Sequence, residues 1–354
     1  MRYRKLGNTG LTVSEIGFGT IPILSGDVPV LPAYHSPDVE EAVSIMKKAY
    51  DFGCNLFDTA GFDEYGDAEY KLGVFASRVA RDTVILMDKV RKYTGEEMRS
   101  AVLASCERLG TNPDIYFVHQ VDERNAQDVF SKGGALDALA ELKKEGVIRF
   151  TGIASHYYSV LERAADDERA DVLQMSGNIL ECGMLKRMME NRAMIEKGVI
   201  LNKVYAAGLL TNEYDPSELI GGILHYPIAG ALIGIGTMEE CEAAMQREYP
   251  PLEIPFEDAF RYLSRRYDLI GCDRCQKCLC SHRHELYSIV RYYNYMKLGK
   301  EEWARRNLRM YMKKVRKHCL ECTDKPCLSS CPRNLPLYEV MMRISEELDD
   351  AAKR

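Results

Sequence analysis

Ionisable side chains follow three short apolar runs in the first 120 residues, and together they could move a proton. These runs lead into Asp58, Lys89 and His119, and Tyr65 follows the first of them. A lysine ammonium beside a tyrosine phenol stabilises the phenolate and lowers the pKa of the tyrosine, while a nearby aspartate keeps the lysine charged. A histidine beside the phenol can hydrogen-bond a carbonyl oxygen and orient it. The set predicts a proton donor for a carbonyl being reduced, or an acceptor for an alcohol being oxidised.

Short apolar strands alternating with helices are predicted to position these groups. Buried strands joined by crossover helices imply a parallel sheet. Eight such units in roughly 250 residues predict an α/β fold with a closed (β/α)₈ TIM barrel. A doubly wound open sheet is the alternative, but its Gly-x-Gly-x-x-Gly fingerprint after the first strand is missing. The predicted strands lie near 16–20, 55–58, 84–87, 115–118, 150–153, 172–175, 199–201 and 231–235, and the helices include 36–53, 96–109, 133–145, 186–197 and 238–246.

The ends of the chain differ from this repeating pattern. Residues 3–13 predict a β-hairpin that turns at Asn8-Thr9-Gly10. A proline-rich connector, residues 249–257, predicts a boundary between a barrel at 1–248 and a mainly helical domain at 258–354. Helices are expected there at 256–269, 286–317 and about 337–347.

Net charge and the distribution of apolar residues limit the classes of partner and the cellular compartment that we expect. The net charge of the 354-residue chain is −6 and no basic block stands out, so nucleic acid is not the expected partner. The charged N-terminus lacks the apolar stretch of a secretory signal, and no apolar run is long enough to span a bilayer. A cytoplasmic protein is predicted. Disulfides are rare in that compartment, so the twelve cysteines need another explanation.

Eight of the cysteines crowd into two groups near the C-terminus, as Cys-x-x-Cys-x-x-Cys-x-Cys and Cys-x-x-Cys-x₄-Cys-x₃-Cys-Pro. Three thiolates at short spacings can wrap three corners of a cubane, and a distant fourth, commonly followed by proline, ligates the other cluster. Two [4Fe–4S] clusters are therefore predicted, and a pair of tetrahedral zinc sites is the alternative. The expected ligand sets are Cys272, Cys275, Cys278 and Cys331 for one cluster, and Cys319, Cys322, Cys327 and Cys280 for the other.

Other side chains in this part of the chain are interpreted without a chemical role. His282, His284 and His318 lie near the cysteines, but their spacings favour solvent-facing positions outside the ligand sets. Trp303 and a group of tyrosines around Tyr292 are predicted to pack the helices. The cysteines are thus the expected source of chemistry after residue 249.

Several short motifs resemble the aldo-keto reductase family over residues 1–247. They are Lys5-Leu6-Gly7-x-Thr9-Gly10-Leu11-x-Val13, Phe57-Asp58-Thr59-Ala60, Tyr65-Gly66-x-Ala68-Glu69-x-x-Leu72-Gly73, Asp114-Ile115-Tyr116-x-x-His119, Gly152-Ile153-x-Ser155 and Gly234-x-Gly236-Thr237. The resemblance implies that Tyr65 is the general acid-base and that Lys89 lowers its pKa. It also implies that Asp58 is the counter-ion to Lys89 and that His119 orients the carbonyl.

The resemblance also implies a nicotinamide cofactor, NAD(P)(H). Ser155, Gln174 and Asn178 are expected around its carboxamide, and Gly234, Gly236 and Thr237 around a phosphate at a helix N-terminus. Three departures stand out: His156 replaces the usual asparagine after Ser155, Asn202 occupies the place of a stacking aromatic, and Glu239, Glu240 and Glu242 replace basic residues. Carboxylates repel a 2′-phosphate but accept from a ribose hydroxyl. An NADP preference is therefore in doubt, and NADH or weak nicotinamide binding is open.

The cysteine-rich end is similar to the two-cluster ferredoxin module that is fused to some aldo-keto reductases of anaerobes. The resemblance implies a redox enzyme for a small carbonyl or alcohol, with electrons exchanged through the clusters with ferredoxin or another carrier. The alternative is a catalytically weak barrel that senses redox state or transfers electrons as a binding module. Cys278-x-Cys280 is shorter and Cys322-x₄-Cys327 longer than the regular spacing.

The loop that carries Tyr65 is longer than is usual in the family. Four residues, Gly61-Phe62-Asp63-Glu64, separate Ala60 from Tyr65 where two are usual. Tyr65 must then be delivered by a longer loop, and the acids Asp63 and Glu64 are expected at the rim of the site. The position of Tyr65 is the first feature to compare with the structure.

Overall fold

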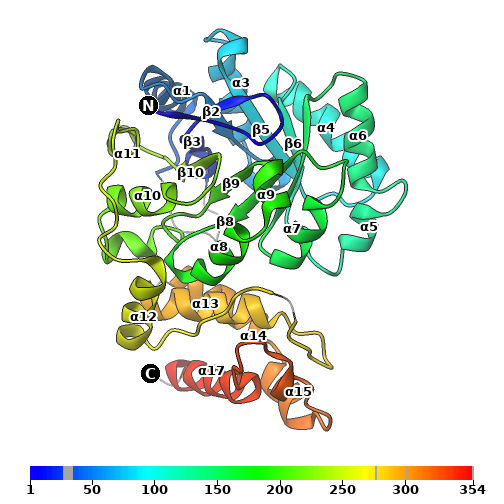
Figure 1. Ribbon diagram of the computed structural model, residues 1–354, viewed down its shortest axis with the longest axis vertical. Coiled ribbons are helices and arrows are strands. Elements are labelled where there is room, and N and C mark those ends of the chain that lie inside the picture. The colour runs from blue at the N-terminus through cyan, green and yellow to red at the C-terminus, as the bar shows by residue number, and fades with distance from the viewer. Residues whose placement is uncertain (27–34, 276, 300–301, 353–354) are drawn as a thin grey trace.

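The computed structural model describes residues 1–26, 35–275, 277–299 and 302–352, and in this part of the chain eight parallel strands close a barrel (Figure 1). The strand β10 pairs with β9 on one side and with β3 on the other, which completes the ring. The predicted parallel barrel is thereby confirmed. Its strands are β3 (Ile16–Gly19), β4 (Leu56–Asp58), β5 (Ile85–Val90), β6 (Ile115–Val118), β7 (Phe150–Ser155), β8 (Val172–Ser176), β9 (Val199–Asn202) and β10 (Gly230–Gly234).

The strands read as continuous apolar runs because both of their faces are buried. Alternate residues of β4 show this: Leu56 packs in the barrel interior, and Phe57 packs against the helices outside. The predicted N-terminal hairpin is present as β1 (Tyr3–Lys5) and β2 (Thr12–Ser14), paired antiparallel. Its Leu6 and Val13 join the interior cluster beside Leu56. The hairpin therefore closes the end where the strands begin, and the opposite end is left for a site.

Helices surround the barrel, and the predicted helix over 186–197 is in fact two. Asn191 ends the first and caps the second, because its side chain accepts a 3.1 Å hydrogen bond from the Met194 amide. No helix in the described part of the chain is long and apolar enough to cross a membrane. The helices are α1 (Val39–Asp51), α2 (Phe62–Tyr65), α3 (Ala68–Ala76), α4 (Gly95–Leu109), α5 (Ala126–Phe130), α6 (Ala135–Lys144), α7 (Tyr158–Ala165), α8 (Cys182–Met189), α9 (Arg192–Lys197), α10 (Pro216–Leu224) and α11 (Met238–Ala244).

After residue 249 every element that the structure describes is helical. The predicted stretch over 286–317 contains three helices, and two of its residues, 300 and 301, lie outside the described part. Figure 1 shows α13 next to the barrel, with α15 and α17 on the far side of it. These helices share an apolar core that includes Ile289, Leu308 and Ile344. Their bounds are α12 (Phe256–Tyr267), α13 (Leu286–Gly299), α14 (Glu302–Met312), α15 (Val315–Glu321), α16 (Cys327–Ser330) and α17 (Leu337–Ala352).

Candidate active site

Asp58 and Lys89 form a buried ion pair where two neighbouring strands end. Asp58 is the last residue of β4, and Lys89 lies near the end of β5, its neighbour in the sheet. Lys89 Nζ lies 2.6 Å from Asp58 Oδ2 and donates a second 2.6 Å hydrogen bond to the Thr59 carbonyl oxygen. Their side chains are 1% and 7% exposed. Removing either member would leave a buried charge, so the pair holds both groups in place.

Tyr65 lies over this pair, delivered by the one-turn helix α2. Lys89 Nζ is 5.2 Å from the centroid of the tyrosine ring. The pKa of Tyr65 is raised, first by burial and then by the carboxylates of Asp58 and Glu64. The sequence predicted a lowered pKa, and the difference arises because the phenol is buried beside two carboxylates. At neutral pH the phenol therefore carries its proton.

His119 is engaged by a carboxylate that the sequence placed at the rim. Its Nδ1 hydrogen-bonds Glu64, and both side chains are nearly buried. Arg91 Nε lies 3.2 Å from the same Glu64 oxygen. Burial lowers the pKa of His119 and outweighs the opposing effect of Glu64. Of the two extra acids, Asp63 is exposed as predicted, whereas Glu64 is an interior partner that the lengthened loop brings to His119.

The residues predicted around a nicotinamide carboxamide lie close together but differ in their bonding. Gln174 Nε2, from β8 across the barrel, donates a 2.9 Å hydrogen bond to Asp58 Oδ1. Ser155 Oγ donates a 2.6 Å hydrogen bond to the Val121 carbonyl. Asn178 Nδ2 donates a 2.9 Å hydrogen bond to a backbone carbonyl in the loop after β9. Ser155 and Asn178 thus hold loops in place, whereas the Oε1 atom of Gln174 is buried with no hydrogen-bond partner in the described chain.

The turn predicted to cradle phosphate is occupied by a side chain of its own helix. Glu240 Oε2 accepts hydrogen bonds from the amides of Gly236 (2.7 Å) and Thr237 (3.2 Å). Thr237 Oγ1 in turn accepts from the Glu240 amide, which completes a capping box at the start of α11. A carboxylate therefore sits where the motif predicts an anion.

A cavity of about 780 Å³ opens at the strand ends beside Asp58 and Tyr65. Two of the predicted cofactor residues, His156 and Gly234, also line it. Lys89 and His119 are not among the lining residues and lie just behind them, with 7% of His119 exposed. The candidate site is therefore a large chamber with the Asp58–Lys89 pair and the Tyr65 phenol in one wall.

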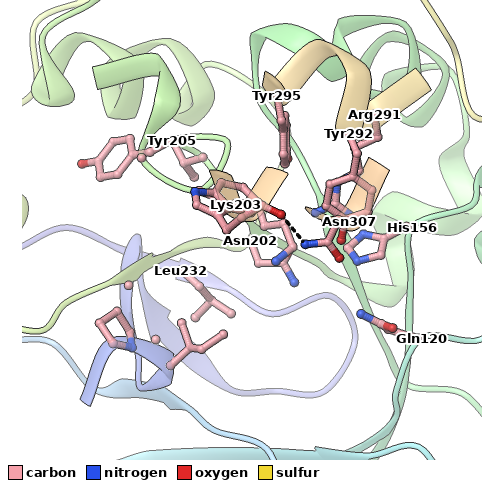
Figure 2. Close-up of a pocket in the computed structure, with 18 of the residues that line it drawn as sticks. Gln120, His156, Asn202, Lys203, Tyr205, Leu232, Arg291, Tyr292, Tyr295 and Asn307 are labelled. Atoms are coloured by element: carbon pink, nitrogen blue, oxygen red, sulfur yellow. Dashed lines mark hydrogen bonds between the residues drawn. The ribbon is translucent and has the colours of Figure 1, made fainter. Parts of the chain in front are cut away.

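The facing wall comes from α13 and α14, which the sequence assigned to packing. Arg291, Tyr292 and Tyr295 of α13 reach the cavity (Figure 2). Trp303 of α14 also lines it. The Arg291 guanidinium lies over the Tyr295 ring at 5.2 Å, and that ring meets Trp303 edge-on at 5.8 Å. The aromatic residues are evident in the sequence, but whether their side chains face the cavity depends on how the helices pack on the barrel.

Asn202 and Lys203, at the end of β9, complete the lining (Figure 2). Burial lowers the pKa of Lys203 to about 7, and the positive charges of Arg291, Lys89 and Arg91 contribute. Asn202 Oδ1 is buried and finds no hydrogen-bond partner in the described chain. The sequence showed Asn202 only as a departure from a motif and assigned Lys203 no role, although a lysine at a strand end was a usable signal.

The eight C-terminal cysteines lie in two groups of four neighbouring thiols. Cys272, Cys275, Cys278 and Cys331, the inner group, line a cavity of about 420 Å³. Cys280, Cys319, Cys322 and Cys327 form the outer group: burial raises the pKa of Cys319, and the other three thiols raise it further. All eight are free thiols. The nearby His282 and His318 rings stack on each other at 4.4 Å.

Arg274 ties the inner group to the barrel. It lies between Cys272 and Cys275, is 4% exposed, and forms a buried ion pair with Glu181 just after β8. Its Nη1 donates a 2.5 Å hydrogen bond to Ser176 Oγ, which lies 3.1 Å from His156 Nδ1. A chain of hydrogen bonds thus runs from the cysteine loop to the lining of the large cavity. The sequence analysis missed Arg274, because its burial depends on the contact between the two regions.

The two cavities share a wall. The rings of Tyr157 and Tyr287 meet edge-on at 4.9 Å, and both residues line the 780 Å³ cavity and the 420 Å³ cavity. Arg274 lies over the Tyr287 ring at 4.4 Å. The inner cysteine group is therefore separated from the candidate active site by one layer of aromatic side chains.

Known proteins match the barrel part of the chain. The model of the aldo/keto reductase family matches residues 15–222, which end before the cysteine-rich segment. L-galactose dehydrogenase of Arabidopsis thaliana is 30% identical over 228 residues, covering 60% of this chain and 68% of that protein. NADH-specific methylglyoxal reductase of Escherichia coli is 26% identical over 243 residues, covering 61% and 72%.

Solved structures agree on the fold. A Pseudomonas aeruginosa protein assigned to the aldo-keto reductases superposes with a TM-score of 0.57 at 27% identity, covering 68% of this chain and 92% of that one. An aldo-keto reductase of Bacillus halodurans in its holo form gives a TM-score of 0.61 at 22% identity, covering 74% and 96%. These likenesses extend over about the first three quarters of the chain or less.

Proposed function

The chain belongs to the aldo/keto reductase family and is an oxidoreductase, and from this premise we propose that it interconverts a small carbonyl compound and its alcohol. One observation carries the proposal: the Tyr65 phenol lies over the buried Asp58–Lys89 pair in the wall of a large cavity. We further propose that electrons come from a nicotinamide cofactor, from two [4Fe–4S] clusters, or from both.

Tyr65 is the proposed proton donor. Its raised pKa keeps the phenol protonated, which suits the reduction of a carbonyl more than the oxidation of an alcohol. In reduction the carbonyl carbon gains a hydride and the oxygen takes the phenol proton, and Tyr65 then regains a proton from solvent. Lys89, whose Nζ lies 5.2 Å from the centroid of the Tyr65 ring, steadies the transient phenolate, and Asp58, itself held by Gln174, keeps Lys89 in place. His119, steadied by Glu64, is the proposed carbonyl-orienting group.

A nicotinamide cofactor fits the other side of the cavity, and when bound it supplies the hydride. Asn202 Oδ1, in the cavity lining, is a buried acceptor with no donor in the described chain, and a carboxamide N–H would satisfy it. The acidic residues Glu239, Glu240 and Glu242 favour NAD(H) over NADP(H), because carboxylates repel a 2′-phosphate and can accept from a ribose hydroxyl. A relative is named as NADH-specific, which is in line with this preference.

The two cysteine groups are the proposed ligands of two [4Fe–4S] clusters, which exchange single electrons. Four thiols line or adjoin a cavity in the inner group, and four neighbour one another in the outer group. Arg274 and Lys325, in the two cysteine loops, have φ of +51° and +38°, conformations that turn backbone amides toward an enclosed anion. A pair of zinc sites is the alternative for the same cysteines, and in the described chain no group of three or more His, Cys, Asp or Glu is arranged to hold a metal ion of either kind.

A second candidate function is a redox-sensing or electron-transfer module with a weak barrel. It is favoured by the Glu240 carboxylate in the phosphate turn and by the lack of an aromatic at Asn202. Under either function the barrel (1–248), the connector (249–257) and the helical domain (258–354) are the proposed units. The ion pair beneath Tyr65 favours the enzyme.

Anaerobic purification followed by metal analysis and turnover tests the proposal. Two cubanes predict about eight irons and eight acid-labile sulfides per chain. Zinc in place of iron would overturn the clusters and leave the reductase assignment to be judged by turnover. Oxidation of NADH with small carbonyls, methylglyoxal first because a relative is named for it, is the expected activity. Cluster reduction and oxidation with no turnover on any carbonyl or alcohol would instead support the sensing module.

A further inference from the structure

We propose that the outer cysteine group is the docking site of an acidic one-electron carrier protein, an inference that rests on the proposed clusters. The docking surface consists of Leu279, Leu320 and Leu328 with Lys313 and Lys317. It combines exposed apolar side chains with positive charge around half-buried thiols. In the proposed step the carrier loses one electron and the outer cluster gains it, and two such steps with a proton supply one hydride equivalent.

The three leucines are unusually exposed for their size, and each lies directly beside cysteines of the outer group. Leu279, Leu320 and Leu328 are 59%, 62% and 54% exposed. Leu279 precedes Cys280, Leu320 follows Cys319, and Leu328 follows Cys327. Apolar side chains left in water around a functional group are typical of interaction sites.

Hydrogen bonds bring the leucines to one end of the module. The amide of Leu279 donates a 2.9 Å bond to Ser330 Oγ, two residues after Leu328. Ser281 Oγ bonds both carboxylate oxygens of Asp324 at 3.0 Å, which fastens the same loop to the segment between Cys322 and Cys327. The apolar side chains therefore surround the outer group and are not scattered over the helices.

Positive charge surrounds the leucines in a chain that is otherwise acidic. Residues 313–333 contain six lysines and arginines against two acids, whereas the whole chain has a net charge of −6. Lys317 and Leu320 are three positions apart on α15 and so lie on one face, and the exposed Lys313 lies in the turn before that helix. A basic rim attracts an acidic protein, speeds the encounter and sets its orientation.

The location suits a carrier better than a substrate or a nucleic acid. Figure 1 shows α15 on the side of α13 that faces away from the barrel, so a docked protein leaves the large cavity open. The inner group and the Tyr157–Tyr287 layer lie between this surface and the cavity. Phosphate backbones would be drawn by the lysines, but they make no use of three exposed leucines.

Binding of a strongly acidic bacterial ferredoxin, measured by calorimetry under anaerobic conditions, tests the inference. Wild-type protein should bind at about 50 mM NaCl and more weakly at about 300 mM, because salt screens surface charges. The double variants Lys313→Glu/Lys317→Glu and Leu320→Ser/Leu328→Ser should each weaken the affinity by about tenfold or more. The matched controls are Lys132→Glu/Lys144→Glu and Leu103→Ser on the barrel, where all three residues are exposed.

Cluster content separates this inference from the proposed function. Iron, sulfide and reduction by methyl viologen, a small mediator that needs no docking surface, should be equal in all variants. If the clusters are present and the outer variants bind the carrier as well as wild type does, the docking site is wrong, but the proposed electron relay through the clusters stands. If the protein contains no clusters and both outer variants abolish carrier binding, the docking site stands, but the proposed electron relay is wrong. Binding of duplex DNA but not ferredoxin, or self-association lost in the same variants, would also overturn the inference.

Discussion

The charged side chains in the two walls of the large cavity differ in whether they are paired with an opposite charge. On the strand side Lys89 pairs with Asp58 at 2.6 Å, and Arg91 reaches Glu64 at 3.2 Å. Across the cavity, no carboxylate of the described chain lies within ion-pair distance of Lys203, and the guanidinium of Arg291 lies over tyrosine rings. Paired charges set a geometry before any ligand arrives, whereas a desolvated cation stays costly until an anion enters. We infer that the strand wall around Asp58 and Lys89 is preorganised for chemistry, and that the side where Lys203 at the end of β9 meets Arg291 of α13, here called the helical wall, is preorganised for an anionic ligand.

Tyr65→Phe should show the largest effect, because it removes the proton that the strand wall is built to deliver. Carbonyl reduction should fall by about 10²–10⁴-fold, the usual contribution of a general acid. The free energy of unfolding should change by less than about 0.5 kcal/mol, since the hydroxyl makes no hydrogen bond within the described chain. Steady-state kinetics and urea unfolding measure the two quantities. Full turnover on every accepted substrate would assign the proton to another group.

Lys89→Met should break the pairing of the strand wall. It leaves the Asp58 carboxylate buried with Gln174 alone and should cost about 3–5 kcal/mol of stability. The double variant Asp58→Asn/Lys89→Met removes both charges and should regain most of that loss without regaining activity. Urea unfolding of the three proteins gives the comparison. A double variant as unstable as Lys89→Met would show that packing, and not the unpaired charge, dominates.

The strand wall could be predicted from the sequence, because parallel strands bring their ends together. Asp58, Lys89 and His119 follow apolar runs, and a closed barrel places such ends at one mouth. The same reasoning failed for Glu64, which reads as a loop acid and becomes an interior partner only because α2 turns it inward. The pKa direction of Tyr65 was also wrong, since burial of the phenol beside two carboxylates is a property of the folded chain.

The helical wall could not be predicted, because it depends on how two regions meet. The cysteine spacing is a local signal along a short segment, and the two ligand sets that it predicts stay a prediction. That Arg274 would enter the barrel mouth, and that Arg291 would face Lys203, follows only from the packing of the helices on the barrel. Spacing within one segment carries no information on such contacts.

Lys203→Met should remove the cost of the unpaired cation. With a folded pKa of about 7, below the ordinary 10.5, Lys203 binds its proton less tightly in the folded chain than in the unfolded one. The variant should therefore gain about 1–3 kcal/mol at pH 6, a figure reduced for partial exposure. The gain should be full below pH 7 and shrink to nothing as the pH approaches 10.5. Urea midpoints of both proteins at pH 6 and pH 9.5 measure this, with exposed Lys132→Met as the control that should show no trend.

Glu64→Gln should have the smallest effect. It tests whether the buried contact between Glu64 and His119 contributes to the strand wall in the way that the Asp58–Lys89 pair does. The carboxylate supports protonation of His119 against burial, so its loss should lower the pKa of His119 further, which NMR titration of the histidine ring can follow. A less firmly held ring should slow carbonyl reduction by about tenfold, or roughly 1.4 kcal/mol of barrier. Asp63→Asn is the matched control, because that neighbouring acid is 78% exposed and lies 3.4 Å from Lys92 on the surface. Equal effects of the two changes would mean that general loop charge, and not the buried contact with His119, is responsible.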